Sequence, residues 1–419
     1  MTFNRRNLVQ TAAAAVLVIL WLLTASPLKF PVPANAWLRL DPLLALANWV
    51  AVGSPGALFW PAAGLLLISV AWGRVFCAWG CPVGALLDLQ TTLLRKAGYR
   101  GYRRLNKLPA LNLVVLALVI VSAAAGWGAV TGLLDPLVFA HRALTFVRAG
   151  RLPETLLVVL ALGLVAPRFW CRFLCPLGGL LGIVHRPVRL WRGQGRGVEF
   201  PLLPESRASA KGDGPRYSRR EFLGLLAGGL VVSGGAPAVP AVRPRGGERF
   251  LRPPGALSER RFTAACVRCG ECIKVCPTRG LLPALTEAGL GGLWTPHLVP
   301  RVGECKRCML CGKVCPTGAL RPIPVALMKL GTAAVDTSAC WAWNGTRPCR
   351  VCVDRCPKKI ISRDAQGRPV VDAAACDGCG TCEKVCPVRQ AAITVTSAGE
   401  RRRDAQGQDA ADTTVREEL

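Results

Sequence analysis

Cysteine is the residue type in this sequence whose number and spacing point most directly to chemistry. Sixteen of the 20 cysteines fall into four groups of four after residue 260. Three groups have the spacing C-x2-C-x2-C-x3-C-P, namely Cys266, Cys269, Cys272 and Cys276; Cys305, Cys308, Cys311 and Cys315; and Cys376, Cys379, Cys382 and Cys386. In bacterial ferredoxins this run binds a [4Fe–4S] cluster, and the fourth cysteine can reach a neighbouring cluster. The sequence therefore predicts three such clusters.

The remaining group departs from this spacing. It consists of Cys340, Cys349, Cys352 and Cys356, and its first gap holds eight residues instead of two. Because a longer loop closes at only a small additional entropic cost, we predict a fourth [4Fe–4S] cluster here. Small residues that suit a loop wrapped around an inorganic core lie in the regular groups, at Gly270, Gly312, Gly378 and Gly380. The spacing leaves two pairings open. Adjacent groups could exchange their fourth cysteine, or the outer two groups could exchange with each other and the inner two likewise.

Disulfides and zinc are the alternative roles for these sixteen cysteines. A cysteine-rich exported domain ordinarily forms disulfides, but consecutive C-x2-C steps crowd the thiols locally. Structural zinc is typically bound by paired C-x2-C units that a longer stretch separates. The complete ferredoxin run occurs three times, and this favours clusters over both alternatives.

The other four cysteines form two matching C-x3-C-P segments. They are Cys77 and Cys81 in the first segment, and Cys171 and Cys175 in the second. On a helix, cysteines four residues apart share a face, and the proline that follows breaks the regular structure. Two facing pairs could bind a fifth cluster or a single metal ion, or act as a redox-active dithiol. Their alternative role is packing as small core residues.

The elements that position these cysteines begin with a series of apolar stretches, at about residues 8–25, 57–76, 109–126, 154–168 and 222–240. A helix of about 20 residues spans a bilayer. Basic residues gather in alternate loops, so the positive-inside rule places the N-terminus and both strongly basic loops in the cytoplasm. Each C-x3-C-P segment would then lie at the cytoplasmic end of an even-numbered span. These loops account for much of the net charge of +28, and we expect no nucleic-acid partner.

The fold class that follows is a membrane α-helical domain, with four spans plus a fifth signal or anchor helix, followed by an α+β bacterial-ferredoxin-like polyferredoxin domain. The expected parts are a membrane domain at 1–197, a linker at 198–255, a four-cluster domain at 256–397 and a disordered, charged tail at 398–419. The linker contains Arg219 and Arg220 before a weakly apolar run that ends in Ala-x-Ala, which is the layout of a Tat export signal. An ordinary fifth span is the alternative.

Few other residues suggest catalysis. His141 and Asp135, in the second outer loop, could accept protons from a quinol, although loop residues of these types are mostly only solvated. The sequence has no P-loop, no dinucleotide-binding glycine motif, no H-E-x-x-H and no nucleophile elbow. The pattern favours electron transfer. It leaves open whether the chain is part of an enzyme, as the electron-transfer part of a quinol dehydrogenase would be.

On these residues the sequence resembles the quinol-oxidising ferredoxin subunits associated with periplasmic nitrate reductase. Residues 1–197, with the two C-x3-C-P segments, resemble the NapH-type membrane ferredoxin. Residues 216–397, with the twin arginine and the lengthened third group, resemble exported four-cluster ferredoxins of the MauM/NapG type. The two subunits are normally separate chains. The membrane subunit usually ends in its own pair of ferredoxin motifs, and none lies between Cys175 and Cys266 here.

The resemblance implies an iron-sulfur protein of the bacterial inner membrane, with the ferredoxin domain on the periplasmic side. It would pass electrons from membrane quinol through [4Fe–4S] clusters to a periplasmic reductase or cytochrome. Its partners would be membrane lipid, the quinone pool and that acceptor. A ferredoxin-type maturation or regulatory factor for a redox enzyme is the alternative, and a membrane-tethered ferredoxin without a quinol site is a third.

Overall fold

The chain divides into two compact units. The structure, a computed structural model, describes residues 5–23, 35–53, 59–99, 111–148, 150–191, 250–285, 287–403 and 409–411. The N-terminal unit consists of residues 1–24 and 30–240, and the C-terminal unit consists of residues 25–29 and 241–419. The first is helical, whereas the second is built from short helices and two-stranded sheets.

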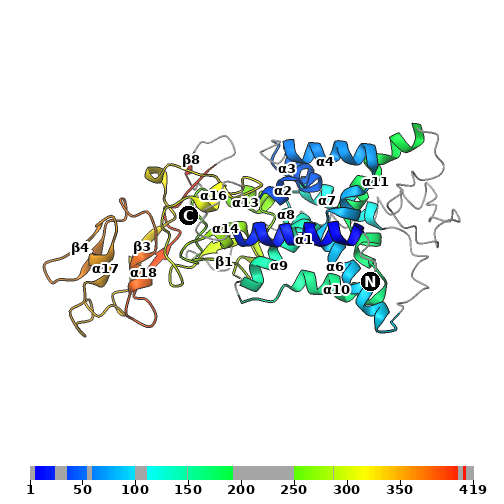
Figure 1. Cartoon of the computed structure of the whole chain (residues 1–419). Helices are drawn as coiled ribbons and strands as arrows, with labels where there is room; N and C mark the ends of the chain where they lie inside the picture. Colours follow the sequence, from blue (N-terminus) through cyan, green and yellow to red (C-terminus); the bar gives the residue numbers. More distant parts are fainter. Residues whose placement is uncertain are drawn as a thin grey trace. The chain divides into compact units, whose positions relative to one another are not determined.

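The N-terminal unit is a set of packed helices (Figure 1). They are α1 (Arg5–Leu23), α2 (Ala36–Arg39), α3 (Pro42–Val52), α4 (Phe59–Trp72), α5 (Val75–Trp79), α6 (Pro82–Lys96), α7 (Asn112–Ala124), α8 (Gly128–Leu134), α9 (Pro136–Arg148), α10 (Glu154–Val165), the π-helix η2 (Trp170–Leu174) and α11 (Pro176–Trp191). Helix α11 packs against α4 and α7, α3 packs against α7, and α1 packs against α6. Cys81 and Cys175 belong to the apolar core between these helices.

The first four expected apolar stretches form α1, α4, α7 and α10, which are 19, 14, 13 and 12 residues long. Within the described residues, none of the single helices has both the length and the apolar character that crossing a membrane requires. Helices α8 and α9 together satisfy these two criteria, and the pair is bent by 82°.

Two helices of this unit begin at an Asp-Pro pair. Asp41 starts α3, and its Oδ1 accepts hydrogen bonds of 2.9 and 3.3 Å from the backbone N–H groups two and three residues further on. Asp135 starts α9 in the same way, with hydrogen bonds of 2.9 and 3.2 Å. The aspartate caps the helix, and the proline that follows has a φ suited to the first turn. Both aspartates are fully buried.

The C-terminal unit contains short elements between long loops (Figure 1). They are α13 (Glu259–Ala265), α14 (Glu271–Val275), β1 (Leu281–Pro283), α15 (Gly289–Gly292), β2 (Pro296–Leu298), α16 (Leu310–Lys313), the 3-10 helix η5 (Val325–Leu327), β3 (Thr332–Val335), α17 (Val351–Arg355), β4 (Ile361–Arg363), β5 (Pro369–Val371), α18 (Thr381–Val385), β6 (Ile393–Thr396), β7 (Arg401–Arg403) and β8 (Asp409–Ala411). Four antiparallel pairs form, β1–β2, β3–β6, β4–β5 and β7–β8. The β3–β6 pair brackets the last two cysteine groups.

The C-terminal unit begins earlier than the expected residue 256. Leu251 is fully buried and bridges Leu298. Arg252 is 2% exposed; its guanidinium forms an ion pair with Glu259 and donates to Thr295 Oγ1 at 2.8 Å. A charge this deeply buried requires such partners, so these residues are part of the fold and not of a linker.

The described residues at the start of the expected tail are held by contacts. Strand β7 pairs with β8, and the Arg402 guanidinium forms ion pairs with Glu259 and Glu400. Through these ion pairs with Arg402, the start of the segment 398–419, which was expected to be disordered, is attached to the C-terminal unit. The twin arginine at Arg219 and Arg220, and the apolar stretch at 222–240, lie outside the described residues.

Candidate cluster sites

The sixteen C-terminal cysteines surround four separate cavities, each lined by four thiols. The sets are site A with Cys266, Cys269, Cys272 and Cys315; site B with Cys276, Cys305, Cys308 and Cys311; site C with Cys356, Cys376, Cys379 and Cys382; and site D with Cys340, Cys349, Cys352 and Cys386. Each site takes three cysteines from one group and the fourth from an adjacent group. The first two groups therefore exchange their last cysteine, and so do the last two.

The four cavities are alike in size and in chemistry. The empty space among the lining residues, open space at the mouth included, runs from about 330 Å³ at site C to about 390 Å³ at site A. Their walls are mostly backbone and apolar side chains beside the thiols. Four cysteine thiols around a small, mostly apolar cavity are the ligand set of a [4Fe–4S] cubane, so the residues present fit this group at all four sites.

The loops of the three regular groups turn in the same way. The residues on both sides of the second cysteine have positive φ, and they are Arg268 and Gly270, Arg307 and Met309, and Gly378 and Gly380. At Gly378 a side chain would also be excluded by space, because a Cβ would lie 2.6 Å from the Gly331 backbone nitrogen. Left-handed conformation on both sides bends the chain around the cavity, and glycine adopts it without strain.

The thiol geometry argues against the zinc and disulfide alternatives. All 20 cysteines are free. Among the described residues, no three His, Cys, Asp or Glu side chains converge closely enough to hold a single metal ion. The cysteines thus stand around a volume and do not converge on a point. Burial raises the pKa of Cys305 to about 12 and that of Cys352 to about 11, so iron must displace their protons.

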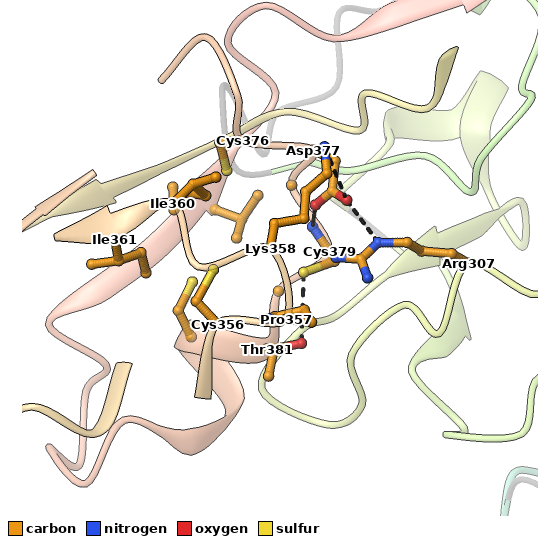
Figure 2. Close-up of a pocket in the computed structure, with 15 residues that line it drawn as sticks. Arg307, Cys356, Pro357, Lys358, Ile360, Ile361, Cys376, Asp377, Cys379 and Thr381 are labelled. Atoms are coloured by element: carbon orange, nitrogen blue, oxygen red, sulfur yellow. Dashed lines mark hydrogen bonds and ion pairs between the residues drawn. The ribbon is translucent and has the colours of Figure 1, made fainter. Parts of the chain in front are cut away.

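Site C shows how neighbouring groups interlock. In Figure 2, Cys356, Cys376 and Cys379 point into one cavity, and Arg307 reaches Asp377 beside it. The Arg307 Nε donates to Asp377 Oδ2 at 2.7 Å, and Arg307 belongs to the loop of site B. The Cys305 backbone N–H also donates to the Cys379 carbonyl at 2.7 Å. Sites B and C are therefore in direct contact.

These contacts arrange the four sites in the order A, B, C, D. Sites A and B share two cysteine groups, and their helices α14 and α16 pack together. Sites C and D share the other two groups, with α17 packed on α18. Figure 1 shows α17 and β4 at one end of this unit and α13 at the other. Sites A and D are therefore the two ends of a series.

The thiols at site D and site B are the more open ones. Cys340, Cys349 and Cys386 are partly exposed at site D, and Cys308 is exposed at site B. At sites A and C, three of the four thiols are buried.

The structure also gathers the four cysteines of the N-terminal unit. Every pair among Cys77, Cys81, Cys171 and Cys175 lies within electrostatic range. The expected shared helix face is replaced by a wider turn: the backbone N–H of each second cysteine bonds to the carbonyl five residues earlier, at 2.9 Å for Cys81 and 2.8 Å for Cys175. The reason is that the proline after each second cysteine starts a new helix.

Cationic and backbone donors surround this quartet. The Gly178 backbone N–H donates to Cys175 Sγ at 3.4 Å. Arg74 lies close to Cys77, and Arg168 lies close to Cys171. Donors and positive charge next to a thiol favour its thiolate, which is the form that binds metal.

The position of Asp135 differs from the expectation. It was predicted to lie in an outer loop, across the membrane from the cysteines. In the structure its carboxyl group lies beside that of Asp41, and Asp41 lies within electrostatic range of Cys77. His141, one turn into α9, is buried and its Nδ1 lies 3.3 Å from the Leu137 carbonyl.

Sequence reasoning missed Asp41, Arg74 and Arg168, although a signal for them was present. Cys171 follows Cys77 by 94 positions, and the same offset relates Asp135 to Asp41 and Arg168 to Arg74. Extending the comparison of the two C-x3-C-P segments backwards along the chain would have found all three.

Comparison with known proteins agrees with these sites. A family profile described as "4Fe-4S binding domain" matches residues 54–98 and 155–197, which contain both C-x3-C-P segments. Two further profiles with the same description match residues 368–393 and residues 266–279. No solved structure matches the chain significantly.

Curated relatives cover part of the chain. The ferredoxin-type protein NapG of Escherichia coli (strain K12) is 39% identical over 202 residues, which is 43% of this chain and 86% of NapG. The methylamine utilization ferredoxin-type protein MauM of Paracoccus denitrificans is 42% identical over 163 residues, or 35% of this chain and 71% of MauM. The ferredoxin-type protein NapF of Haemophilus influenzae is 37% identical over 150 residues, or 35% of this chain and 78% of NapF.

Sites with this ligand set and series order define an iron-sulfur electron-transfer protein of the ferredoxin type, with several 4Fe-4S clusters. Within that class, the chain belongs to the family of ferredoxin-type proteins that includes NapG and MauM.

Proposed function

We propose that this protein is a membrane-anchored electron conduit, which takes electrons from membrane quinol and delivers them to an acceptor outside the cytoplasm. The N-terminal unit would lie in the bacterial inner membrane with its N-terminus in the cytoplasm, and the C-terminal unit on the periplasmic side. The acceptor would be a periplasmic reductase or cytochrome. When bound, the clusters supply one-electron transfer, while the protein sets their positions and surroundings.

The outward faces of the N-terminal helices support the membrane part of this proposal. Large apolar side chains are exposed along three of them: Ile19 and Leu22 on α1, Trp60, Leu67 and Trp72 on α4, and Leu157 and Val158 on α10. A water-facing surface rarely carries so many large apolar groups, and lipid contact accounts for them.

The observation that carries the quinol part is the proximity of a buried carboxyl pair to the thiol quartet. Asp41 and Asp135 use their Oδ1 atoms to cap helices, and neither Oδ2 has a donor among the described residues. Two neighbouring buried carboxylates repel each other, so the pair favours the uptake of one proton on an Oδ2 atom. The second Oδ2 atom can accept another. Oxidation of one quinol releases two electrons and two protons, so a proton acceptor beside the thiols suits this chemistry.

The thiol quartet has the ligands for a fifth cluster. Cys77, Cys81, Cys171 and Cys175 supply four thiols, and the nearby guanidinium groups offset the negative charge of four thiolates. We propose that these residues bind iron as a [4Fe–4S] cluster, in line with the family profile that matches both segments.

The test is an anaerobic EPR spectrum of the purified protein before and after addition of a menaquinol analogue. We expect cubane signals with quinol alone. Signals that develop only with dithionite would overturn the quinol part and favour a maturation factor or a tethered ferredoxin. Release of the protein from membranes by alkaline carbonate would overturn the membrane part.

A further inference from the structure

The lengthened gap of the third cysteine group has a structural use that electron conduction alone does not explain. Residues 341–348 form a loop between Cys340 and Cys349, and the hairpin β4–β5 lies opposite. Between them is an open hollow of about 1000 Å³, open space at its mouth included, whose lining includes Gly345, Arg347, Cys349, Arg350, Arg363 and Gly367. The described lining residues thus include three arginines and no carboxylate.

The hollow is adjacent to the last site of the series. Cys349 lines both the hollow and the cavity of site D. Trp341 also lines site D, and the Arg347 guanidinium lies 3.9 Å from its ring centroid. A molecule in the hollow would therefore lie against Cys349, whose thiol also lines site D.

The loop holds this shape through its own hydrogen bonds. The Asn344 Oδ1 accepts from the Thr346 backbone N–H at 3.0 Å, and the Asn344 Nδ2 donates to the Ser338 carbonyl at 3.2 Å. Trp343 Nε1 donates to the Pro369 carbonyl at 3.1 Å, which ties the loop to β5. The arginines thus project from a fixed frame, which reduces the entropy lost when a partner binds.

The charge around the hollow selects the kind of partner. Arg347, Arg350 and Arg363 are exposed, and Arg355, Lys358 and Lys359 add further exposed positive charge in the same segment. Asp354 offsets only Arg350, at 3.1 Å with both side chains more than half exposed. A partner with a complementary acidic surface would be steered here and held briefly, as suits transient electron transfer.

We propose that this hollow is the docking site of a redox protein whose electron-accepting centre lies beneath an acidic surface, and that electrons leave the series through site D. The inference rests on the electron-transfer function proposed above, but not on the quinol as donor. An open hollow whose arginines are exposed suits a macromolecular surface better than a small ligand, which a pocket buries almost completely.

The test uses the full-length holoprotein with its clusters reduced by dithionite, which is then removed. Each reduced cluster gives one electron to one acidic plastocyanin, whose Cu(II) becomes Cu(I). The variant is the triple change Arg347→Glu, Arg350→Glu and Arg363→Glu. The matched control is Arg260→Glu, Arg279→Glu and Lys313→Glu, which makes the same change in charge at exposed positions in and near the first two cysteine groups.

At low ionic strength, the rate constant should fall about tenfold or more in the hollow variant and stay within about threefold in the control. Binding of oxidised protein to immobilised plastocyanin should weaken in the same order. Equal losses in both variants, or none in the hollow variant, would overturn the proposal. Unchanged EPR spectra would show that the clusters are intact, and failure of quinol reduction alone would count against the proposed function and not against this site.

Discussion

The two units gather four cysteines in different ways. In the C-terminal unit, each site takes three thiols from one short loop and the fourth from the adjacent group. In the N-terminal unit, the quartet takes two thiols from each of two repeats, where one helix ends and the next begins. The first arrangement is largely fixed by local chain geometry. The second exists only because two distant helical segments pack together, so it depends on the tertiary fold.

The largest effect is expected from variants that test whether the first two cysteine groups exchange their fourth cysteine. Cys315→Ser should abolish or alter the same EPR signal as Cys269→Ser, because both residues line site A. Cys276→Ser should affect the same signal as Cys308→Ser, at site B. The measurement is EPR of each dithionite-reduced variant together with its iron content. If Cys315→Ser instead matched Cys308→Ser, the exchange would be refuted.

The quartet should respond as one unit. Cys77→Ala should remove about one cluster's iron, and adding Cys171→Ala should remove no more, because the site is already lost. Iron analysis and Mössbauer spectra of the single and double variants measure this. Full additivity of the two changes would show two independent sites and contradict the shared quartet.

The carboxyl pair should matter for quinol and not for a small reductant. We expect Asp135→Asn to slow reduction by a menaquinol analogue about 100-fold, since a proton acceptor contributes roughly that factor. Reduction by dithionite should be unchanged. Stopped-flow absorbance at the cluster bands follows both reactions. Equal slowing with both reductants would point to a structural defect instead.

A smaller effect is expected at the junction of sites B and C. Asp377→Ala removes the partner of Arg307, whose side chain is 20% exposed, and should destabilise the C-terminal unit by about 1.5–3 kcal/mol. The matched control is Asp354→Ala, which breaks the exposed pair with Arg350 and should change stability by less than about 1 kcal/mol. Thermal loss of the cluster absorbance compares the two variants. A similar shift in both would show that the junction contributes little.

The same difference between the units explains what the sequence could predict. Ferredoxin spacing is a local property, so the sixteen cysteines and their chemistry were predictable from it. Which groups exchange a cysteine depends on tertiary contacts such as α14 against α16 and α17 against α18, and the spacing does not reveal these. Helix lengths were misjudged because apolar composition does not reveal where a helix ends. The place of Asp135 was misjudged because composition does not reveal that the chain bends by 82° between α8 and α9.

The crossed cysteines also set an order in time. As the chain is synthesised, site B becomes complete at Cys311, and site A, although its first three ligands come earlier, must wait for Cys315. Sites C and D become complete at Cys382 and Cys386 in the same manner. The two sites of each pair, A with B and C with D, therefore become complete within a few residues of each other along the chain. Maturation should accordingly proceed in two steps of two clusters, and a partly loaded population should contain two or four of these clusters more often than one or three.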